Sequence, residues 1–400
     1  MTVDDPRGAG PGDGDRPARD GRWAWAEIDL DAIGDNVRLY RQMVAPAAVW
    51  AVVKADAYGH GAVPGANATI EAGAAGLCVA LVQEGVELRE AGITAPILIL
   101  SQQPAAQLGE LIDHDLTPTL YSVSAIAACT EVVRRRGKAP YGVQLKVDTG
   151  MNRVGAAPTE VAELVEAIRS SGVLRLDGVF THLAAADEPA HPANAAQLSE
   201  FADVIAACRL RDDGVPLHAL NSAGAIAFAD ARYSLVRVGV ALYGVSPGAG
   251  LLAEPEHAEF LARLRPALAL KARVSHVKQI QPGDGVAYGH RFVAQVPLWV
   301  ATVPIGYADG VPRALAFHGA EVLIGGLRRL ILGVVTMDQI IVAVDDSVQV
   351  GDEVILLGRQ GAQEIRVEEW ADRGGTIGYE ITCGISRRIT RHHRGGGRLH

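Results

Sequence analysis

Short apolar runs alternate with longer segments of helical periodicity between residues 47 and 244. This alternation is typical of βα units around a parallel sheet, whose buried strands are rich in β-branched residues. The pattern predicts eight consecutive strands, each followed by a helical or looped segment. The eight runs are residues 49–54, 76–82, 95–101, 116–122, 141–148, 174–182, 215–221 and 233–240.

The number of runs helps to choose between two α/β folds. Eight parallel strands close a (β/α)₈ barrel of the TIM type. The alternative, an open doubly wound sheet, usually carries a GxGxxG turn after its first strand. No such turn follows residues 49–54. The sequence therefore favours an α/β protein with an N-terminal (β/α)₈ barrel.

After residue 260 the pattern changes to strand-like runs separated by Gly and Asp turns. One helix candidate interrupts them at residues 367–373. The change predicts a second, mostly β domain. A strand at residues 23–29 could belong to either domain. The strand-like runs cover residues 264–280, 298–305, 321–324, 330–343 and 353–357.

These patterns divide the chain into a barrel domain at residues 22–258 and a β domain at residues 259–391. Residues 1–21 are rich in Gly, Pro and Asp and lack the apolar core of a signal peptide, which predicts a disordered tail. Residues 392–400 are predicted to form a second tail. No apolar run reaches the roughly 20 residues of a membrane span, so membrane residence is not expected.

The composition is that of an ordinary globular protein, with 49% hydrophobic and 21% charged residues and a net charge of -9. The negative charge and the lack of a basic block argue against a nucleic-acid partner. Four cysteines, Cys78, Cys129, Cys208 and Cys383, are widely spaced, which signals neither a disulfide framework nor a zinc site. A cytoplasmic location is expected.

The chemistry of a barrel of this kind lies at the C-terminal ends of its strands, where the βα loops converge. Polar residues follow five of the predicted strands, and we expect them to face one pocket. They are Lys54, Lys146 with Arg153, His182, Asn221 with Ser222, and Arg237 followed by Gly239.

Lys54 ends an apolar run and precedes a loop with Gly59 and Gly61. Burial favours the neutral amine, which can condense with an aldehyde. A solvated lysine at a loop edge is the simpler interpretation from spacing alone. The glycine loop favours a cofactor site, because its N–H groups and the following helix can hold a phosphate.

Asn221, Ser222 and Gly239 follow the last two predicted strands, where barrels commonly bind phosphate. Ser222 is predicted to donate its hydroxyl and to cap a short helix, and a plain cap is the alternative. Arg237 lies inside an apolar strand, where a guanidinium needs a partner. That partner is either a structural ion pair or a bound group. His182 ends the sixth strand and faces the same side.

Nine segments in order resemble bacterial alanine racemases, from residue 23 to about residue 391. The resemblance implies that Lys54 carries pyridoxal 5'-phosphate and is the base on the D-alanine side. Tyr288 of a neighbouring subunit is implied to be the base on the L-alanine side, which implies a homodimer. Inverting a stereocentre requires a base on each face of Cα. The segments are WAEIDLDAIGDNV, VVKADAYGHG, LKVDTGMNRVG, FTHLAAADEP, HALNSAGA, LVRVGVALYG, GVAYGH, PIGYADGVPR and VVTMDQ.

The same resemblance assigns further roles. Arg237 is placed at the pyridine nitrogen, with His182 linking it towards Tyr288. Arg153 and Met337 are placed at the substrate carboxylate. Lys146 matches a lysine that is often carbamylated, and Tyr307 is expected to narrow the entrance. The residues implied to bind the cofactor at its phosphate side are Tyr58, Asn221, Ser222, Gly239 and Val240.

Three positions depart from the family pattern. Arg387 stands where a phosphate-binding tyrosine is expected, and an arginine there could pair with phosphate instead. Val334 and Thr336 replace an arginine and a cysteine at the entrance. The changes at Val334 and Thr336 are expected to alter the electrostatic steering of the entrance and the side chains that it tolerates.

The function implied by the resemblance is interconversion of L- and D-alanine, supplying D-alanine for peptidoglycan. A broad-specificity or serine-type racemase on the same scaffold is one alternative, because specificity depends on the pocket around the alanine methyl group. A non-catalytic cofactor-binding protein is another. The presence of Tyr288 and of a complete second domain argues against the latter.

Overall fold

A computed structural model describes residues 21–396 of the chain. Residues 1–20 and 397–400, which fall in the two predicted tails, lie outside the described residues. The chain forms two compact units. The barrel unit contains Ile28–Leu268 and Arg366–Ile385, and the β unit contains Ala269–Ile365 and Ser386–His392 together with the described residues up to Glu27.

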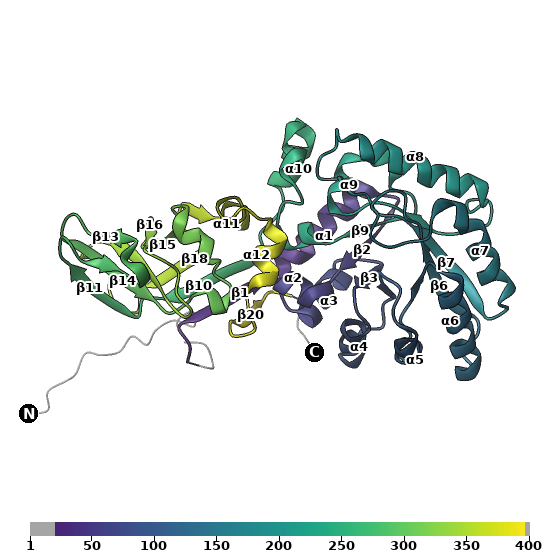
Figure 1. Cartoon of the computed structure of the whole chain (residues 1–400), viewed down its shortest axis with the longest axis horizontal. Coiled ribbons are helices and arrows are strands. Elements are labelled where there is room, and N and C mark those ends of the chain that lie inside the picture. The colour runs from purple at the N-terminus through teal and green to yellow at the C-terminus, as the bar shows by residue number, and fades with distance from the viewer. Residues whose placement is uncertain (1–20, 397–400) are drawn as a thin grey trace, which may run out of the picture. The chain divides into compact units, whose positions relative to one another are not determined.

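Each of the eight predicted runs overlaps a strand of the barrel unit. The strands are short and buried, as expected for parallel strands covered on both faces. Helices surround them (Figure 1). The strands are β2 (Ala48–Val52), β3 (Gly76–Val79), β4 (Ile97–Ile99), β5 (Thr119–Leu120), β6 (Tyr141–Lys146), β7 (Leu174–Phe180), β8 (Leu217–His218) and β9 (Leu235–Val238).

Hydrogen bonds close these strands into a ring. Two parallel sheets run in the orders β4-β3-β2-β9 and β5-β6-β7-β8. A parallel bridge between Leu98 and Thr117 joins β4 to the segment entering β5. At the other junction, the Arg237 amide donates to the Leu220 carbonyl at 3.0 Å. The predicted (β/α)₈ barrel is therefore confirmed.

The helices of the barrel unit follow the strands in sequence. Helix α1 begins after Asp29, whose side chain accepts a hydrogen bond from the Ala32 amide and so caps the helix. The helices are α1 (Leu30–Val44), α2 (Lys54–Gly59), α3 (Ala62–Glu71), α4 (Val82–Glu90), α5 (Leu108–Asp113), α6 (Val123–Arg136), α7 (Val161–Ser170), α8 (Pro192–Ala207), α9 (Ser222–Ala227) and α10 (Pro255–Ala262).

The β unit is built on one long sheet. Among the described residues its strands run in the order β11-β14-β17-β16-β15-β18-β10-β1-β20, with β19 on β18. Strands β1 and β10 alternate buried and half-buried residues, as one covered face requires. The strands are β1 (Ala24–Asp29), β10 (Leu268–Arg273), β11 (His276–Ile280), β14 (Leu298–Val303), β15 (Glu321–Ile324), β16 (Leu327–Leu332), β17 (Ile340–Val344), β18 (Glu353–Gln360), β19 (Gln363–Ile365) and β20 (Thr390–Arg394).

A two-stranded hairpin, β12 (Gly285–Val286) and β13 (Phe292–Val293), adds to the β unit. Val286 joins a cluster of buried side chains that includes Ile280 and Leu332, so this hairpin is fixed to the sheet at its base. The loop between its two strands is short and contains Tyr288.

Two helices late in the chain, α11 (Val367–Gly374) and α12 (Gly378–Gly384), group with the barrel rather than with the β unit. Their contacts explain this. The Glu368 carboxylate accepts the Ser246 amide at 2.7 Å, and the Tyr379 ring lies 6.0 Å from the Tyr58 ring. The compact units therefore differ from the predicted domain bounds, which placed residues 366–385 in the β domain.

The predicted second tail is wrong for residues 392–394, because they complete strand β20. This strand pairs with β1, so its amides and carbonyls join a sheet. The His393 imidazole also contacts the His60 carbonyl at 2.7 Å. Long-range pairing of this kind leaves no signal in a polar sequence such as Thr-Arg-His-His-Arg at positions 390–394, whose last three residues the tail prediction treated as unstructured.

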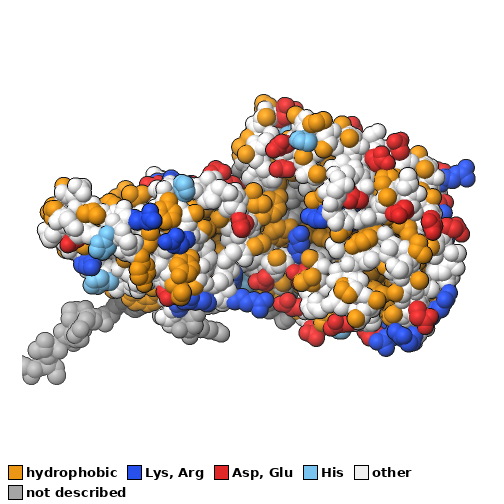
Figure 2. Space-filling view, in the orientation of Figure 1, with side chains coloured by type: hydrophobic (Ala, Val, Ile, Leu, Met, Phe, Trp, Pro, Cys, Tyr) orange, Lys and Arg blue, Asp and Glu red, His pale blue; other side chains and the backbone are white. Residues whose placement is uncertain are grey.

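None of the described helices is long and apolar enough to cross a membrane. On the face shown in Figure 2, acidic and basic side chains are interspersed and do not gather into one basic patch.

Asn36 anchors α1 to the end of the barrel, so its replacement should lower the free energy of unfolding. Its amide donates to the carbonyls of Leu242 and Arg265 at 3.0 and 2.9 Å, and its oxygen accepts the Arg265 amide at 2.9 Å. Asn36→Ala leaves these groups unpaired, and we expect the free energy of unfolding to fall by about 2–4 kcal/mol. Denaturant unfolding measures this.

The control is Gln42→Ala, an exposed position on the same helix. We expect that change to stay within about 0.5 kcal/mol of the unsubstituted protein. Equal effects of the two substitutions would contradict the role given to Asn36.

Candidate active site

Lys54 lies at the C-terminal end of β2, at the start of an unusual turn. The four residues 55–58 all have positive φ angles, between 52 and 55°, so α2 is a left-handed turn. For residues other than glycine this costs roughly 1–2 kcal/mol each. Backbone strain of this kind persists only where the surroundings enforce it, and it is typical of functional sites.

The environment of Lys54 favours its neutral form. Burial lowers the pKa of the Lys54 amine, and the positive charge of Arg153 lowers it further, while Glu84 opposes the shift. A neutral amine is the nucleophilic form that condenses with an aldehyde. The predicted role of Lys54 thus has a physical basis in this structure.

Arg237 is buried in β9 and is held entirely by neutral acceptors. Its guanidinium donates to the carbonyls of Thr181 and Ala219 at 2.8 and 3.1 Å, and to Nδ1 of His218 and His182 at 2.6 and 3.1 Å. The structural ion pair considered from the sequence is absent among the described residues. Because these bonds leave the Nε–H unused, the cation remains available to a bound group.

These contacts determine the tautomers of both histidines. A guanidinium can only donate, so Nδ1 of His218 and of His182 must be unprotonated. The remaining proton of His218 lies on Nε2, which is 2.8 Å from the Gln144 amide oxygen. Burial, followed by the charge of Arg237, holds the pKa of both histidines well below its ordinary range. Both rings are therefore neutral, with Nε2–H as donor.

Lys146 lies at the C-terminal end of β6, where it is buried. Its ammonium nitrogen is 5.8 Å from the centre of the Phe180 ring, and no carboxylate hydrogen bond to it is present in the described structure. Burial lowers the pKa of Lys146 to about 8, with Arg153 and Arg237 adding to the effect. A lysine in this state has an appreciable neutral fraction near neutral pH.

Arg153 follows β6 in an exposed loop. Asp148 holds this loop, because its carboxylate accepts the amides of Gly150 and Asn152 at 3.1 and 3.0 Å. The charge of Arg153 acts on both Lys54 and Lys146. The structure therefore brings these three basic side chains to one end of the barrel, as their positions after the strands predicted.

A second group at the same end is rich in hydroxyls and backbone amides. The Ser222 hydroxyl accepts the Gly239 amide at 2.9 Å, and a Cβ atom on Gly239 would lie 2.5 Å from the Tyr58 hydroxyl. Val240 is buried directly after Gly239. The Tyr58 hydroxyl can thus approach this backbone only because residue 239 lacks a side chain.

The predicted cap of α9 requires correction. Asn221, not Ser222, caps the helix, since its side chain accepts the Gly224 amide at 2.9 Å. Ser222 is the first helical residue, and its hydroxyl faces Gly239. The two adjacent polar residues could not be told apart by sequence because either one fits a cap.

Tyr379 is a site residue that the sequence reasoning missed. Its ring lies 6.0 Å from the Tyr58 ring, and burial raises its pKa to about 12. Arg387, expected at the phosphate position, is exposed and lies in the β unit, so its contact with phosphate stays a prediction. Tyr379 lies on α12.

Tyr288, Tyr307 and Met337 all belong to the β unit, whereas the strand-end residues described above belong to the barrel unit. Each is exposed: the exposed fractions are 77%, 43% and 52%. The loops of Tyr307 and Met337 are joined, because the Tyr307 and Ala308 amides donate to the carbonyls of Thr336 and Met337 at 3.0 Å. The β unit thus presents these three side chains outwards.

Ion pairs hold the same loops. Arg388 contacts Asp309 at 3.3 Å and Asp338 at 2.7 Å, so it joins the residues that follow Tyr307 and Met337. Val334 is buried, and the Thr336 hydroxyl donates to the Gln339 carbonyl at 2.8 Å. Neither replacement presents a charge on this surface.

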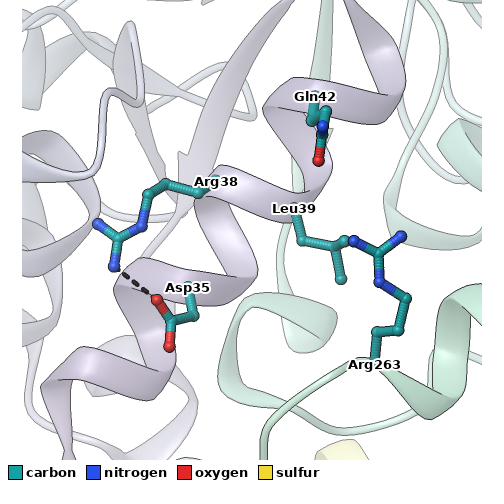
Figure 3. A pocket seen from close by; sticks show the side chains of 5 residues that line it. All are labelled: Asp35, Arg38, Leu39, Gln42 and Arg263. Atoms are coloured by element: carbon teal, nitrogen blue, oxygen red, sulfur yellow. Dashed lines mark hydrogen bonds and ion pairs between the residues drawn. The ribbon is translucent and has the colours of Figure 1, made fainter.

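A separate surface hollow lies along α1 (Figure 3). It is lined by Asp35, Arg38, Leu39, Gln42 and Arg263, and Asp35 and Arg38 form an ion pair at 2.7 Å. It contains none of the strand-end residues. The hollow is therefore distinct from the candidate active site.

Comparisons with known proteins assign both parts of the chain to the same family. Family models described as alanine racemase, N-terminal domain and C-terminal domain match residues 28–247 and 267–393. An alanine racemase from Symbiobacterium thermophilum is 44% identical over 388 residues, covering 96% of this chain and 98% of that protein.

Solved structures give the same result. The alanine racemase of D-cycloserine-producing Streptomyces lavendulae has a TM-score of 0.87 and 39% identity, covering 94% of this chain and 98% of that one. The Bacillus anthracis alanine racemase with bound L-Ala-P has a TM-score of 0.84 and 37% identity, covering 94% and 96%. By sequence, by fold and by both of its domains, the chain belongs to the alanine racemase family.

Proposed function

We propose that this protein interconverts L- and D-alanine with pyridoxal 5'-phosphate, supplying D-alanine for peptidoglycan from the cytoplasm. The observation that carries the proposal is the pair formed by Lys54 and Arg237 at one end of the barrel. One is a half-buried amine held towards its neutral form, and the other is a buried cation without an anionic partner among the described residues. A carbonyl cofactor with an aromatic ring nitrogen complements both.

The residues present fit this cofactor. Lys54 would hold its aldehyde group, and the Nε–H of Arg237 would be available to its ring nitrogen. The hydroxyls of Tyr58 and Ser222 beside the Gly239 backbone suit its phosphate, with Asn221 capping the start of α9. When bound, the cofactor supplies an electron sink for the charge that develops at Cα. The phosphate contacts are assigned to Tyr58, Ser222, Gly239, Val240 and Tyr379.

Racemisation requires a proton acceptor and donor on each face of Cα. Lys54 Nζ serves the face that yields D-alanine, and the Tyr288 hydroxyl of a second copy serves the opposite face. The high exposure of Tyr288 supports contact with another subunit. His182 links Arg237 towards Tyr288. Its Nδ1 accepts a hydrogen bond from Arg237, so its Nε2–H is the group that can donate towards the tyrosine hydroxyl.

The remaining residues position the substrate. Arg153 is assigned to the substrate carboxylate together with Met337, and Tyr307 narrows the approach. Lys146 is assigned to carbamylation: its neutral amine adds to carbon dioxide and releases one proton. The product is an anion that can orient the Arg153 guanidinium. A low pKa assists this reaction because it increases the neutral fraction.

The roles of the two bases can be tested by deuterium exchange at Cα. In D₂O, L-alanine incubated with the protein should form D-alanine deuterated at Cα. Lys54→Ala and Tyr288→Phe should each lower kcat by at least about 1,000-fold, because general acid–base catalysis contributes about 10²–10⁴-fold per group. Chiral chromatography with mass spectrometry follows both products.

Deuteration without D-alanine would show that no opposite base delivers a proton. Formation of neither product would favour the non-catalytic binding alternative. Faster racemisation of serine than of alanine would favour the serine-type alternative.

The carbamylation assigned to Lys146 can be observed directly. Protein equilibrated with ¹³C-bicarbonate should show a carbamate signal by NMR that Lys146→Gln lacks. Because the pKa is about 8, the signal should weaken as the pH falls below that value and the amine becomes protonated. We expect Lys146→Gln to lower kcat/KM roughly ten-fold through disorder of Arg153. An unchanged signal in Lys146→Gln would contradict the assignment.

A further inference from the structure

Glu84 links two of the loops at the active end of the barrel. It lies in the first turn of α4, where its side chain is half-buried. Its Oε2 accepts the amides of Ala80 and Leu81 at 2.8 and 3.1 Å. Its Oε1 accepts the Ala55 amide at 2.7 Å. One carboxylate thus joins the end of β3 to the residue that follows Lys54.

Helix capping explains only half of this arrangement. A glutamate at the third helical position commonly bonds back to the cap of its own helix, as Oε2 does here. Oε1 serves a different element, 29 residues away in sequence. A cap residue does not need that second contact, so it calls for another explanation.

The left-handed turn provides one. Residues 55–58 carry a strain of roughly 1–2 kcal/mol each, which other contacts must offset. Within the segment, the Asp56 carboxylate accepts the Ala62 amide at 2.7 Å, and the Ala57 amide donates to the Val53 carbonyl at 2.9 Å. Glu84 adds a charged hydrogen bond from outside the segment, at the residue next to Lys54.

Charge adds a second connection. The charged and titratable groups that act on Lys54 are the cation Arg153, the carboxylate of Glu84, and the thiols Cys383 and Cys78. Lys54 in turn acts on Lys146. Burial and Arg153 lower the pKa of Lys54, and Glu84 raises it. Glu84 therefore limits how far the amine is driven towards its neutral form.

We propose that Glu84 is a positioning residue for Lys54: its carboxylate holds the strained turn that begins at this lysine through the Ala55 amide. The role rests on the proposed function of Lys54. Glu84 is not a catalytic residue, because it acts on Lys54 through the Ala55 backbone amide and through its own charge.

The test compares three full-length variants with the unsubstituted protein. Glu84→Gln removes the charge at nearly constant size. Glu84→Asp keeps the charge but is too short to span both loops. Glu87→Gln is the matched control, since Glu87 is exposed on the same helix. The readouts are kcat and KM for alanine, the pyridoxal phosphate concentration for half-saturation, and pulse acetylation of Lys54 in cofactor-free protein against pH, followed by mass spectrometry.

We expect Glu84→Gln to lower kcat at least about ten-fold, as loss of a charged hydrogen bond implies. In Glu84→Gln, the extent to which the reagent acetylates Lys54 at pH 7 should rise roughly three-fold, because removal of a negative charge favours the neutral amine. Glu84→Asp should lower kcat while leaving the acetylation profile close to that of the unsubstituted protein. Glu87→Gln should change neither.

A stability loss in Glu84→Gln with unchanged kcat and unchanged Lys54 acetylation would overturn the proposal, because a cap alone would produce it. If Glu84→Gln does not fold, unchanged kcat in Glu84→Asp would overturn it as well. Failure of the unsubstituted protein to racemise alanine would refute the proposed function instead, and the acetylation profiles would still test the link between Glu84 and Lys54.

Discussion

The site depends on one buried cation that has no counter-anion. Arg237 is surrounded by two carbonyl oxygens and two imidazole nitrogens, all of them neutral acceptors. Burying a guanidinium in this way is costly unless its hydrogen bonds are satisfied. The arrangement forces both histidines into the Nε2–H form. Burial, followed by the charge of Arg237, lowers the pKa of His182, and burial, Arg153 and Arg237 together lower the pKa of Lys146.

The second constraint is the backbone next to Lys54. A left-handed turn of four residues places this lysine at the strand end and brings Tyr58 against Gly239. Both features need small or glycine residues around them: a Cβ on Gly59 would lie 2.3 Å from the Thr382 carbonyl of α12. The barrel, α12 and the turn are therefore one packed assembly, and the long-range contacts of α12 complete it.

Local pattern was enough to predict the barrel strands and the residues at their ends, because buried parallel strands leave continuous apolar runs that end in polar residues. It did not reveal which helix returns to the barrel, so Tyr379 was missed, and the assignment of Arg387 stays a prediction. It also could not separate Asn221 from Ser222 as the cap, or detect strand β20. These features depend on contacts between distant segments. The assignments of Tyr288, Tyr307 and Met337 stay predictions, since these side chains belong to the other unit.

We expect Lys54 of one subunit to work with Tyr288 of another. Co-expression of two inactive variants, Lys54→Ala and Tyr288→Phe, tests this, with all dimers purified together and not separated. Each mixed dimer then has one site with both bases intact and one site with neither. We expect recovery of about a quarter of the unsubstituted activity, because about half of the dimers in a statistical mixture are mixed and each has one intact site of two. Activity no higher than that of the separate variants would contradict it and place both bases in the same chain.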